Sequence, residues 1–303
     1  MTDCGASGED CCTSLAVACG TYYRTYTNSG NGPTGESDPA SVSGFRLDKY
    51  EVTVGRFRQF VTAWDGGSGW LPTEGSGKHS HLNGGEGLAN SGRPGIVSYE
   101  PGWLAADDSN VAPTNANLVG ACDASYDATW TVSAGDQENL PINCVNWYEA
   151  YAFCIWDGGF LPSEAEWECA AAGGSQQREY PWGSTDPGTS NQYAIYECYY
   201  PSGRGPCKGV ASFAPVGTAT LGAGAWGQLD LGGSVKEWNL DWFAPYADPC
   251  TDCAELTAPP TTARVNRGGD FANVASYMFP PRRYADYPVS RPSNFGFRCA
   301  RTP

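Results

Sequence analysis

Two short motifs in this sequence carry residue types that can do metal or redox chemistry. His79 and His81 have His-x-His spacing, which in an extended segment places both imidazoles on one side, as zinc binding requires. Cys250 and Cys253 have the Cys-x-x-Cys spacing of redox motifs. The histidines lack a third ligand nearby, and the cysteines follow Pro249 rather than beginning a helix. We therefore expect solvated histidines and a structural disulfide between Cys250 and Cys253.

The number of cysteines indicates the compartment. Thirteen cysteines are spread along 303 residues, mostly outside metal-binding spacings, which is typical of proteins that fold in an oxidising environment. We expect an extracytoplasmic protein that is secreted, periplasmic or surface-anchored. Residues 1–4 show neither a basic nor an apolar signal region, so we expect the signal segment to lie outside this chain.

Composition argues against several other classes of function. The chain has 18 basic and 33 acidic side chains, and its net charge of -15 opposes binding to nucleic-acid phosphates. The sequence contains no run of about 18 apolar residues, so no transmembrane segment is predicted. It also contains no Gly-x-Ser-x-Gly elbow, no Walker loop and no dinucleotide-binding glycine motif after a strand.

The elements that must position these residues follow from periodicity and capping signals. Apolar residues at helical spacing predict a helix over 54–65, and capping boxes at Asn146–Glu149 and Ser163–Glu166 predict two more. The 39 glycines and 22 prolines indicate many turns. Strands are predicted over 45–50, 226–231, 235–242, 263–267 and 295–300. These elements do not alternate regularly, which favours an α+β domain with much irregular structure over a parallel sheet.

The chain divides in two by composition. Residues 1–43 are rich in small polar residues and cysteine, which predicts a loop-like leader packed on the domain. Residues 44–303 form the domain itself. Within it, residues 65–140 indicate long surface loops.

A set of colinear strings is more specific than any of these patterns. They are Phe45-Arg46-Leu47-Asp48-Lys49-Tyr50-Glu51-Val52-Thr53, Pro141-Ile142-Asn143-Cys144-Val145-Asn146-Trp147, Leu161-Pro162-Ser163-Glu164-Ala165-Glu166-Trp167-Glu168, Tyr180-Pro181-Trp182-Gly183, Glu237-Trp238, Arg267-Gly268-Gly269 and Gly296-Phe297-Arg298-Cys299-Ala300. Together they resemble the formylglycine-generating enzyme family, also called the sulfatase-modifying factor domain, over about residues 44–301. The resemblance implies one domain with an elaborated C-type-lectin-like fold.

The resemblance also implies a chemistry that this chain departs from. Active members are copper-dependent oxidases that convert a sulfatase cysteine to formylglycine, using two thiols in the segment after Arg-Gly-Gly. Cuprous ion prefers such soft, low-coordinate thiolates. Here Asn273 and Met278 take the two positions, or Ala275 the second when counted back from Cys299, and residues 254–298 contain no cysteine. We expect no formylglycine-generating activity.

A calcium loop of the family is better preserved. The stretch 230–238 resembles it, and the resemblance implies as ligands the Asp230 carboxylate, the Gly233 and Val235 carbonyls and the Glu237 carboxylate. Two acids and two carbonyls are suitable oxygen ligands for Ca²⁺. The alternative is a plain strand end with solvated acids.

Disulfide pairs are proposed on two grounds. The resemblance implies that Cys299 pairs with Cys154. Pairs Cys122–Cys144 and Cys198–Cys207 would each close a short loop, Cys19–Cys169 would tie the leader to a helix, and Cys4 could pair with Cys11 or Cys12.

The segment that would form the oxidase groove offers contact residues instead of thiols. We expect Asn273, Tyr277, Met278, Arg283 and Tyr284 to line a groove that binds a protein, peptide or glycan, although Arg283 and Tyr284 could equally hold the strand against the core. The predicted function is a calcium-stabilised binding module. Two alternatives stay open. One is an oxidoreductase of the same fold with altered metal chemistry, and the other is a receptor that resembles the variable proteins of diversity-generating retroelements.

Overall fold

The structure is a computed structural model that describes residues 2–65, 69–93, 95–123, 125–207, 209–260 and 262–303. It contains three α-helices, which are α1 (Val54–Asp65), α2 (Trp147–Trp156) and α3 (Glu164–Ala172). Of the helices in these ranges, none is long and apolar enough to cross a membrane.

Fourteen short strands are assigned within the described ranges, and they form five small sheets. They are β1 (Thr2–Cys4), β2 (Glu9–Asp10), β3 (Ser14–Val17), β4 (Gly20–Asn28), β5 (Pro33–Val42), β6 (Phe45–Asp48), β7 (Ala89–Asn90), β8 (Lys236–Trp242), β9 (Cys250–Thr251), β10 (Cys253–Ala254), β11 (Arg264–Arg267), β12 (Tyr284–Asp286), β13 (Phe295–Gly296) and β14 (Ala300–Arg301).

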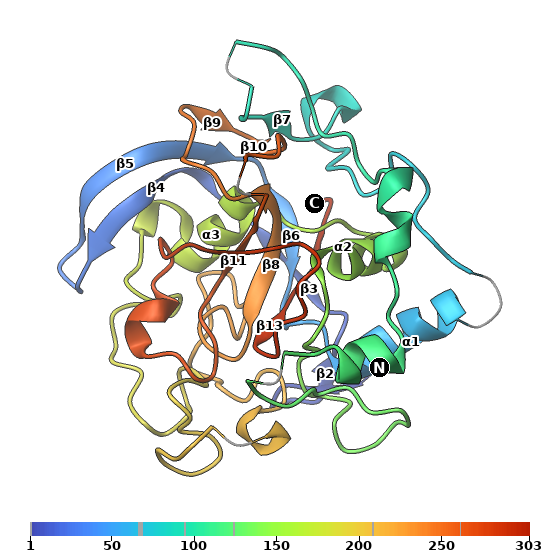
Figure 1. Cartoon of the computed structure of the whole chain (residues 1–303). Coiled ribbons are helices and arrows are strands. Elements are labelled where there is room, and N and C mark those ends of the chain that lie inside the picture. Colours follow the sequence, from blue (N-terminus) through green and yellow to red (C-terminus); the bar gives the residue numbers. More distant parts are fainter. Residues whose placement is uncertain (1, 66–68, 94, 124, 208, 261) are drawn as a thin grey trace.

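The N-terminal 43 residues are not the loop-like leader that composition suggested. Strands β4 and β5 form a long antiparallel hairpin that curves along one side of the molecule (Figure 1). Strand β3 pairs with β6, which lies beyond the expected boundary at residue 43, and β6 also pairs with the C-terminal β14. The polar sequence of β5 concealed this strand, whose exposed residues face solvent. The N-terminal segment therefore supplies strands to the sheets of the domain.

A four-stranded sheet of order β12-β11-β8-β13 lies at the centre (Figure 1). In β8 the side chains alternate, so that Trp238 lies in the core with α2, while Glu237 accepts a hydrogen bond from Trp167 of α3. Because β11 is antiparallel to β8, Arg264 stands opposite Trp242 and Arg267 opposite Glu237. The sheet therefore separates an aromatic face from a charged, buried face.

The helices begin where the capping boxes predicted. The Asn146 side chain accepts the Glu149 N–H at 2.8 Å, and the Ser163 hydroxyl accepts the Glu166 N–H at 3.2 Å; each Glu carboxylate accepts the N–H of its cap residue in return. Helix α3 ends at Gly173, whose φ of 69° suits a residue without a Cβ. Two short helices are thus fixed by local signals.

One predicted strand is absent, and the strand predicted over 295–300 is divided into β13 and β14, which lie in different sheets. Residues 226–231 form turns rather than a strand, because Gly227 donates to the Gly224 carbonyl and Gly224 donates to the Gln228 carbonyl. Gly227 has a φ of 97°, which reverses the chain where a strand would have to extend. The apolar residues that suggested a strand there are instead buried within a turn.

Six disulfides join cysteines of the described residues; four close short loops, and two connect distant parts of the chain. The structure brings together Cys4–Cys11, Cys19–Cys169, Cys122–Cys144, Cys154–Cys299, Cys198–Cys207 and Cys250–Cys253. Cys4 thus pairs with Cys11 and not with Cys12. Among the described cysteines, Cys12 alone is not part of a disulfide. Cys19–Cys169 and Cys154–Cys299 each span about half the chain, and closing such a loop restricts the unfolded chain by about 5 kcal/mol in the chain-entropy model.

Candidate functional site

The segment after β11 turns on Gly268 and Gly269 and is then fixed by one buried carboxylate. One oxygen of Asp270 accepts the N–H groups of Ala272 and Asn273 at 2.9 and 3.1 Å. The other accepts from Lys236 Nζ and Asn294 Nδ2, both at 2.7 Å. This arrangement sets the backbone direction of the predicted groove.

Asn273 and Met278 do not provide a copper site. The Asn273 Oδ1 is buried and has no hydrogen-bond partner within the described structure. Met278 is 1% exposed and packs with Tyr180 and Tyr196. A buried thioether and an amide do not fit cuprous ion, which prefers thiolates.

Tyr277 and Tyr284 form an aromatic pair in this segment. Their rings stack with centroids 5.6 Å apart and 14° between planes, and both side chains are half-buried. The Arg282 guanidinium lies over the Tyr277 ring at 5.2 Å. Stacked phenols beside an exposed guanidinium suit molecular recognition, because such side chains lose little freedom on binding.

Arg283 is a structural residue and does not line the predicted groove. Its guanidinium forms a bidentate ion pair with Glu164 of α3, with both distances 2.7 Å, and donates to the Ala244 carbonyl. It also stacks over Tyr246 at 4.0 Å. The geometry therefore supports the alternative in which Arg283 holds its strand against the core.

A cavity of about 190 Å³ borders the same segment from the side of the N-terminal hairpin. Its lining includes Phe279, Pro281 and Arg282, and also Tyr26 and Asn28 of β4. Sequence reasoning missed the contribution of β4 because the hairpin was expected to be a loop. The alternation of Tyr22, Arg24 and Tyr26 was the signal that could have revealed it.

The loop 230–238, predicted to bind calcium, is buried around Asp230, Val235 and Glu237, and its two acids accept hydrogen bonds from the protein. Asp230 Oδ2 accepts the Gly217 N–H at 2.6 Å. Glu237 Oε2 accepts from both Arg298 Nε and Trp167 Nε1, which uses its two lone pairs, whereas among the described residues Oε1 accepts only from Arg298 Nη2. Glu237 can therefore offer one oxygen to an ion, not two.

Glu51 is a third acid at this loop that sequence reasoning did not select. Its carboxylate accepts the Ser234 hydroxyl at 2.8 Å and the Val235 N–H at 3.1 Å. Burial raises the pKa of Glu51, and the charges of Asp230 and Glu237 raise it further. Burial also raises the pKa of Asp230, to about 6. Of these three buried acids Glu237 pairs with Arg298, while Glu51 and Asp230 act on it from a distance, and such a group of carboxyl oxygens fits a bound cation.

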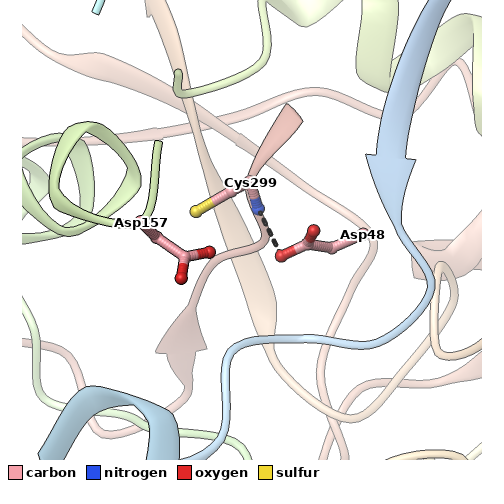
Figure 2. A group of neighbouring side chains, drawn as sticks. All are labelled: Asp48, Asp157 and Cys299. Atoms are coloured by element: carbon pink, nitrogen blue, oxygen red, sulfur yellow. Dashed lines mark hydrogen bonds between the residues drawn. The ribbon is translucent and has the colours of Figure 1, made fainter. Parts of the chain in front are cut away.

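Asp48, Asp157 and Cys299 form a second group of potential ligands (Figure 2), with ligand atoms within 4.8 Å of one another. Metal binding does not fit here, because the Cys299 sulfur is in a disulfide. Arg56 pairs with Asp48 at 2.9 Å and with Asp157 at 2.6 Å, and Arg301 contacts both acids. Two guanidinium groups thus take the place of an ion.

His79 is not the solvated residue that its loop suggested. It is fully buried, with Nδ1 2.9 Å from Glu100 and Nε2 2.9 Å from Glu166. Burial acts to lower the pKa of the imidazole, but the two carboxylates outweigh it and raise the pKa to about 10. His81 lies 6.4 Å away, ring to ring, and is half-buried. A protonated His79 is no zinc ligand.

Comparison with known proteins accounts for this geometry. The family model described as "Sulfatase-modifying factor enzyme 1-like domain" matches residues 4–303. The chain belongs to this family. It is 33% identical over 264 residues to the formylglycine-generating enzyme of Streptomyces coelicolor, covering 84% of this chain and 77% of the relative. This confirms the resemblance stated from the motifs.

Two further matches bear on fold and activity. The mouse protein named "Inactive C-alpha-formylglycine-generating enzyme 2" is 31% identical over 185 residues, which cover 57% of this chain and 54% of that protein. The solved structure of Treponema denticola variable protein 1 superimposes with a TM-score of 0.52 at 21% identity, covering 96% and 95% of the two chains. The α+β, C-type-lectin-like fold of the sulfatase-modifying factor family is confirmed.

The buried His79 predicts a loss of stability at alkaline pH. Its pKa is about 10 in the folded protein against 6.5 as a reference. Its contribution is therefore complete below pH 6.5 and is lost as pH rises through 10. Urea unfolding should show the free energy falling by a few kcal/mol over this range, since one pKa unit corresponds to about 1.4 kcal/mol.

His79→Gln should flatten that fall, and His81→Gln serves as the matched control that should retain it. If the His79→Gln protein loses stability with pH as steeply as the unaltered protein, the protonated triad is wrong.

Proposed function

We propose that this protein is an extracytoplasmic, calcium-stabilised member of the sulfatase-modifying factor family that binds a protein, peptide or glycan and does not generate formylglycine. The observation that carries the proposal is the pair Asn273 and buried Met278 at the positions where the family's copper-binding thiols are expected. An inactive mammalian relative offers a precedent.

The proposed location follows from the sulfur chemistry. Twelve of the thirteen cysteines are in disulfides, and such bonds persist in oxidising compartments. Two of these bonds join residues about 150 positions apart, so the folded domain depends on oxidation. A cytosolic location would keep these thiols reduced.

The proposed binding surface is the stacked pair Tyr277 and Tyr284 with Arg282, together with the adjoining cavity of about 190 Å³. Aromatic and arginine side chains dominate binding energy at interfaces. Arg283 contributes by holding the segment on α3 rather than by contact.

Calcium is proposed at the loop of Asp230, Gly233, Val235 and Glu237. In support, the carboxylates of Glu51, Asp230 and Glu237 are buried around one guanidinium, and hard oxygens are the ligands that Ca²⁺ prefers. When bound, the ion would supply positive charge and a fixed loop geometry. Asp230 and one oxygen of Glu237 would hold it with the two carbonyls.

A sulfatase-type peptide with a Cys-x-Pro-x-Arg motif should keep its thiol in the presence of this protein and added cuprous ion, because no thiolate from 254–298 can hold the metal. Mass spectrometry of the peptide measures this, with the Streptomyces coelicolor enzyme as the positive control. Copper-dependent conversion of the peptide to the aldehyde with turnover would overturn the proposal.

Loss of the tyrosine stack should abolish ligand binding without loss of fold. Peptides that bind the unaltered protein can be selected from a displayed random library. They should bind the double variant Tyr277→Ala/Tyr284→Ala at least tenfold more weakly, because one aromatic anchor contributes about 2 kcal/mol or more. Val289→Ala, exposed in the same region, is the matched control and should keep full binding. Selected peptides that bind both variants equally would exclude this surface.

Calcium should raise the melting temperature, since an ion that binds only the folded state contributes about 2.7 kcal/mol at a concentration one hundred times its Kd. Asp230→Asn should remove the response while keeping an acceptor for the Gly217 N–H. Asp241→Asn, which changes another buried acid, should retain it. Superimposable melting curves in chelator and in millimolar calcium would eliminate the site.

A further inference from the structure

A second cavity lies at the far end of β8 and β11 from the segment described above. Its volume is about 260 Å³. Side chains from α2, β8, β11 and the loops around residues 100–107 and 256–258 line it, and the flat walls are Trp147, Tyr148, Tyr151 and Trp242. The cavity is thus aromatic, and large enough for a ligand of amino-acid size.

The cation in this cavity is Arg264. Its guanidinium is held between two indoles, with its central carbon 3.7 Å from the Trp147 centroid and 3.6 Å from the Trp242 centroid. Nη1 donates to the Leu240 carbonyl at 2.6 Å. The residue is 9% exposed, and its buried Nε has no hydrogen-bond partner in the described structure.

Arg264 also lacks a counter-ion, which distinguishes it from the other buried arginines. Arg56, Arg267 and Arg298 each pair with a carboxylate, whereas no carboxylate of the described residues lies within 4 Å of the Arg264 guanidinium. Burial lowers the pKa of Arg264 to about 9, the direction expected for a charge without a partner. An unpaired buried cation costs several kcal/mol unless an anion reaches it.

Two acids also line the cavity, and neither pairs with Arg264. The Glu100 carboxylate accepts from His79, which carries the compensating charge. Asp107 is half-buried, and burial raises its pKa. The charges of Asp107 and Asp241 act on Arg264 from a distance, but no carboxylate of the described residues forms an ion pair with it, and an anion from outside the chain could do so.

We propose that this cavity binds a small carboxylate carrying a flat apolar body, with the carboxylate on the edge of Arg264 and the apolar body against the aromatic walls. Two sources share this chemistry, a free aromatic acid and the C-terminal residue of a peptide. The half-buried rings of Tyr148 and Trp242 favour a ring over an inorganic anion, since stacking needs a planar partner. The proposal is independent of the binding function proposed above, because the two sites lie at opposite ends of β8.

Calorimetric titration with 3-phenylpropionate and its amide, 3-phenylpropionamide, tests the proposal. The acid should bind with one site per chain, and the amide at least tenfold more weakly, because it cannot pair with the guanidinium. Peptides that end in phenylalanine, with a free or an amidated C-terminus, identify the source of the carboxylate. If the peptide with the free C-terminus binds more tightly than 3-phenylpropionate, the site recognises chain ends. If 3-phenylpropionate binds more tightly, the site recognises small acids.

Variants keep the test independent of folding. Arg264→Gln should abolish binding, and Ala258→Trp, at an exposed position on the cavity wall, should block it while leaving Arg264 in place. Asp107→Asn should strengthen binding severalfold by removing a nearby negative charge. Arg204→Gln, an arginine with a 68% exposed side chain elsewhere, is the control and should bind as the unaltered protein does. No binding of the acid, equal binding of acid and amide, or undiminished binding to the Ala258→Trp protein would overturn the proposal.

Discussion

The fold depends on a single buried guanidinium. Arg298 forms a bidentate pair with Glu237 of β8 and donates to the carbonyls of Asp48, Lys49 and Leu229. It therefore joins the C-terminal segment to β8, to the end of β6 and to the loop before β8. Removing one partner of such a pair costs about 3–5 kcal/mol, because the other charge is left buried and uncompensated. The loop from Leu229 to Glu237 takes its position from this junction.

A second charged network extends the same principle across the sheet. Arg267 contacts Glu168 and lies 3.1 Å from Glu164, and Glu164 also pairs with Arg283. These groups are buried between α3 and β11, so their charges are compensated by one another rather than by water. The network therefore holds the segment with Arg283 against α3.

Local signals predicted local structure, and among the long-range contacts only the disulfides Cys19–Cys169 and Cys154–Cys299 were predicted. The capping boxes at Asn146 and Ser163 placed two helices, since the cap and its partner lie three residues apart. The family motifs located the Arg-Gly-Gly turn and the loop at Asp230. The partners of Arg283 and Glu51 lie 119 and 183 residues away, and no periodicity encodes such a distance. The hairpin was missed because the residues of β5 are mostly polar, so its strand character comes from pairing with β4.

Strand β14 pairs with β6, and Cys299 bonds to Cys154, so the last residues of the chain complete sheets begun by the first. During synthesis Cys154 leaves the ribosome 145 residues before its partner, an interval of roughly 7 to 30 s. Throughout that time β6 lacks one neighbour and Cys154 is open to the wrong thiol. The nascent protein consequently cannot complete its fold progressively from the N-terminus. It must wait for Cys299 and β14, and until they are synthesised the intermediate keeps thiols that have no native partner.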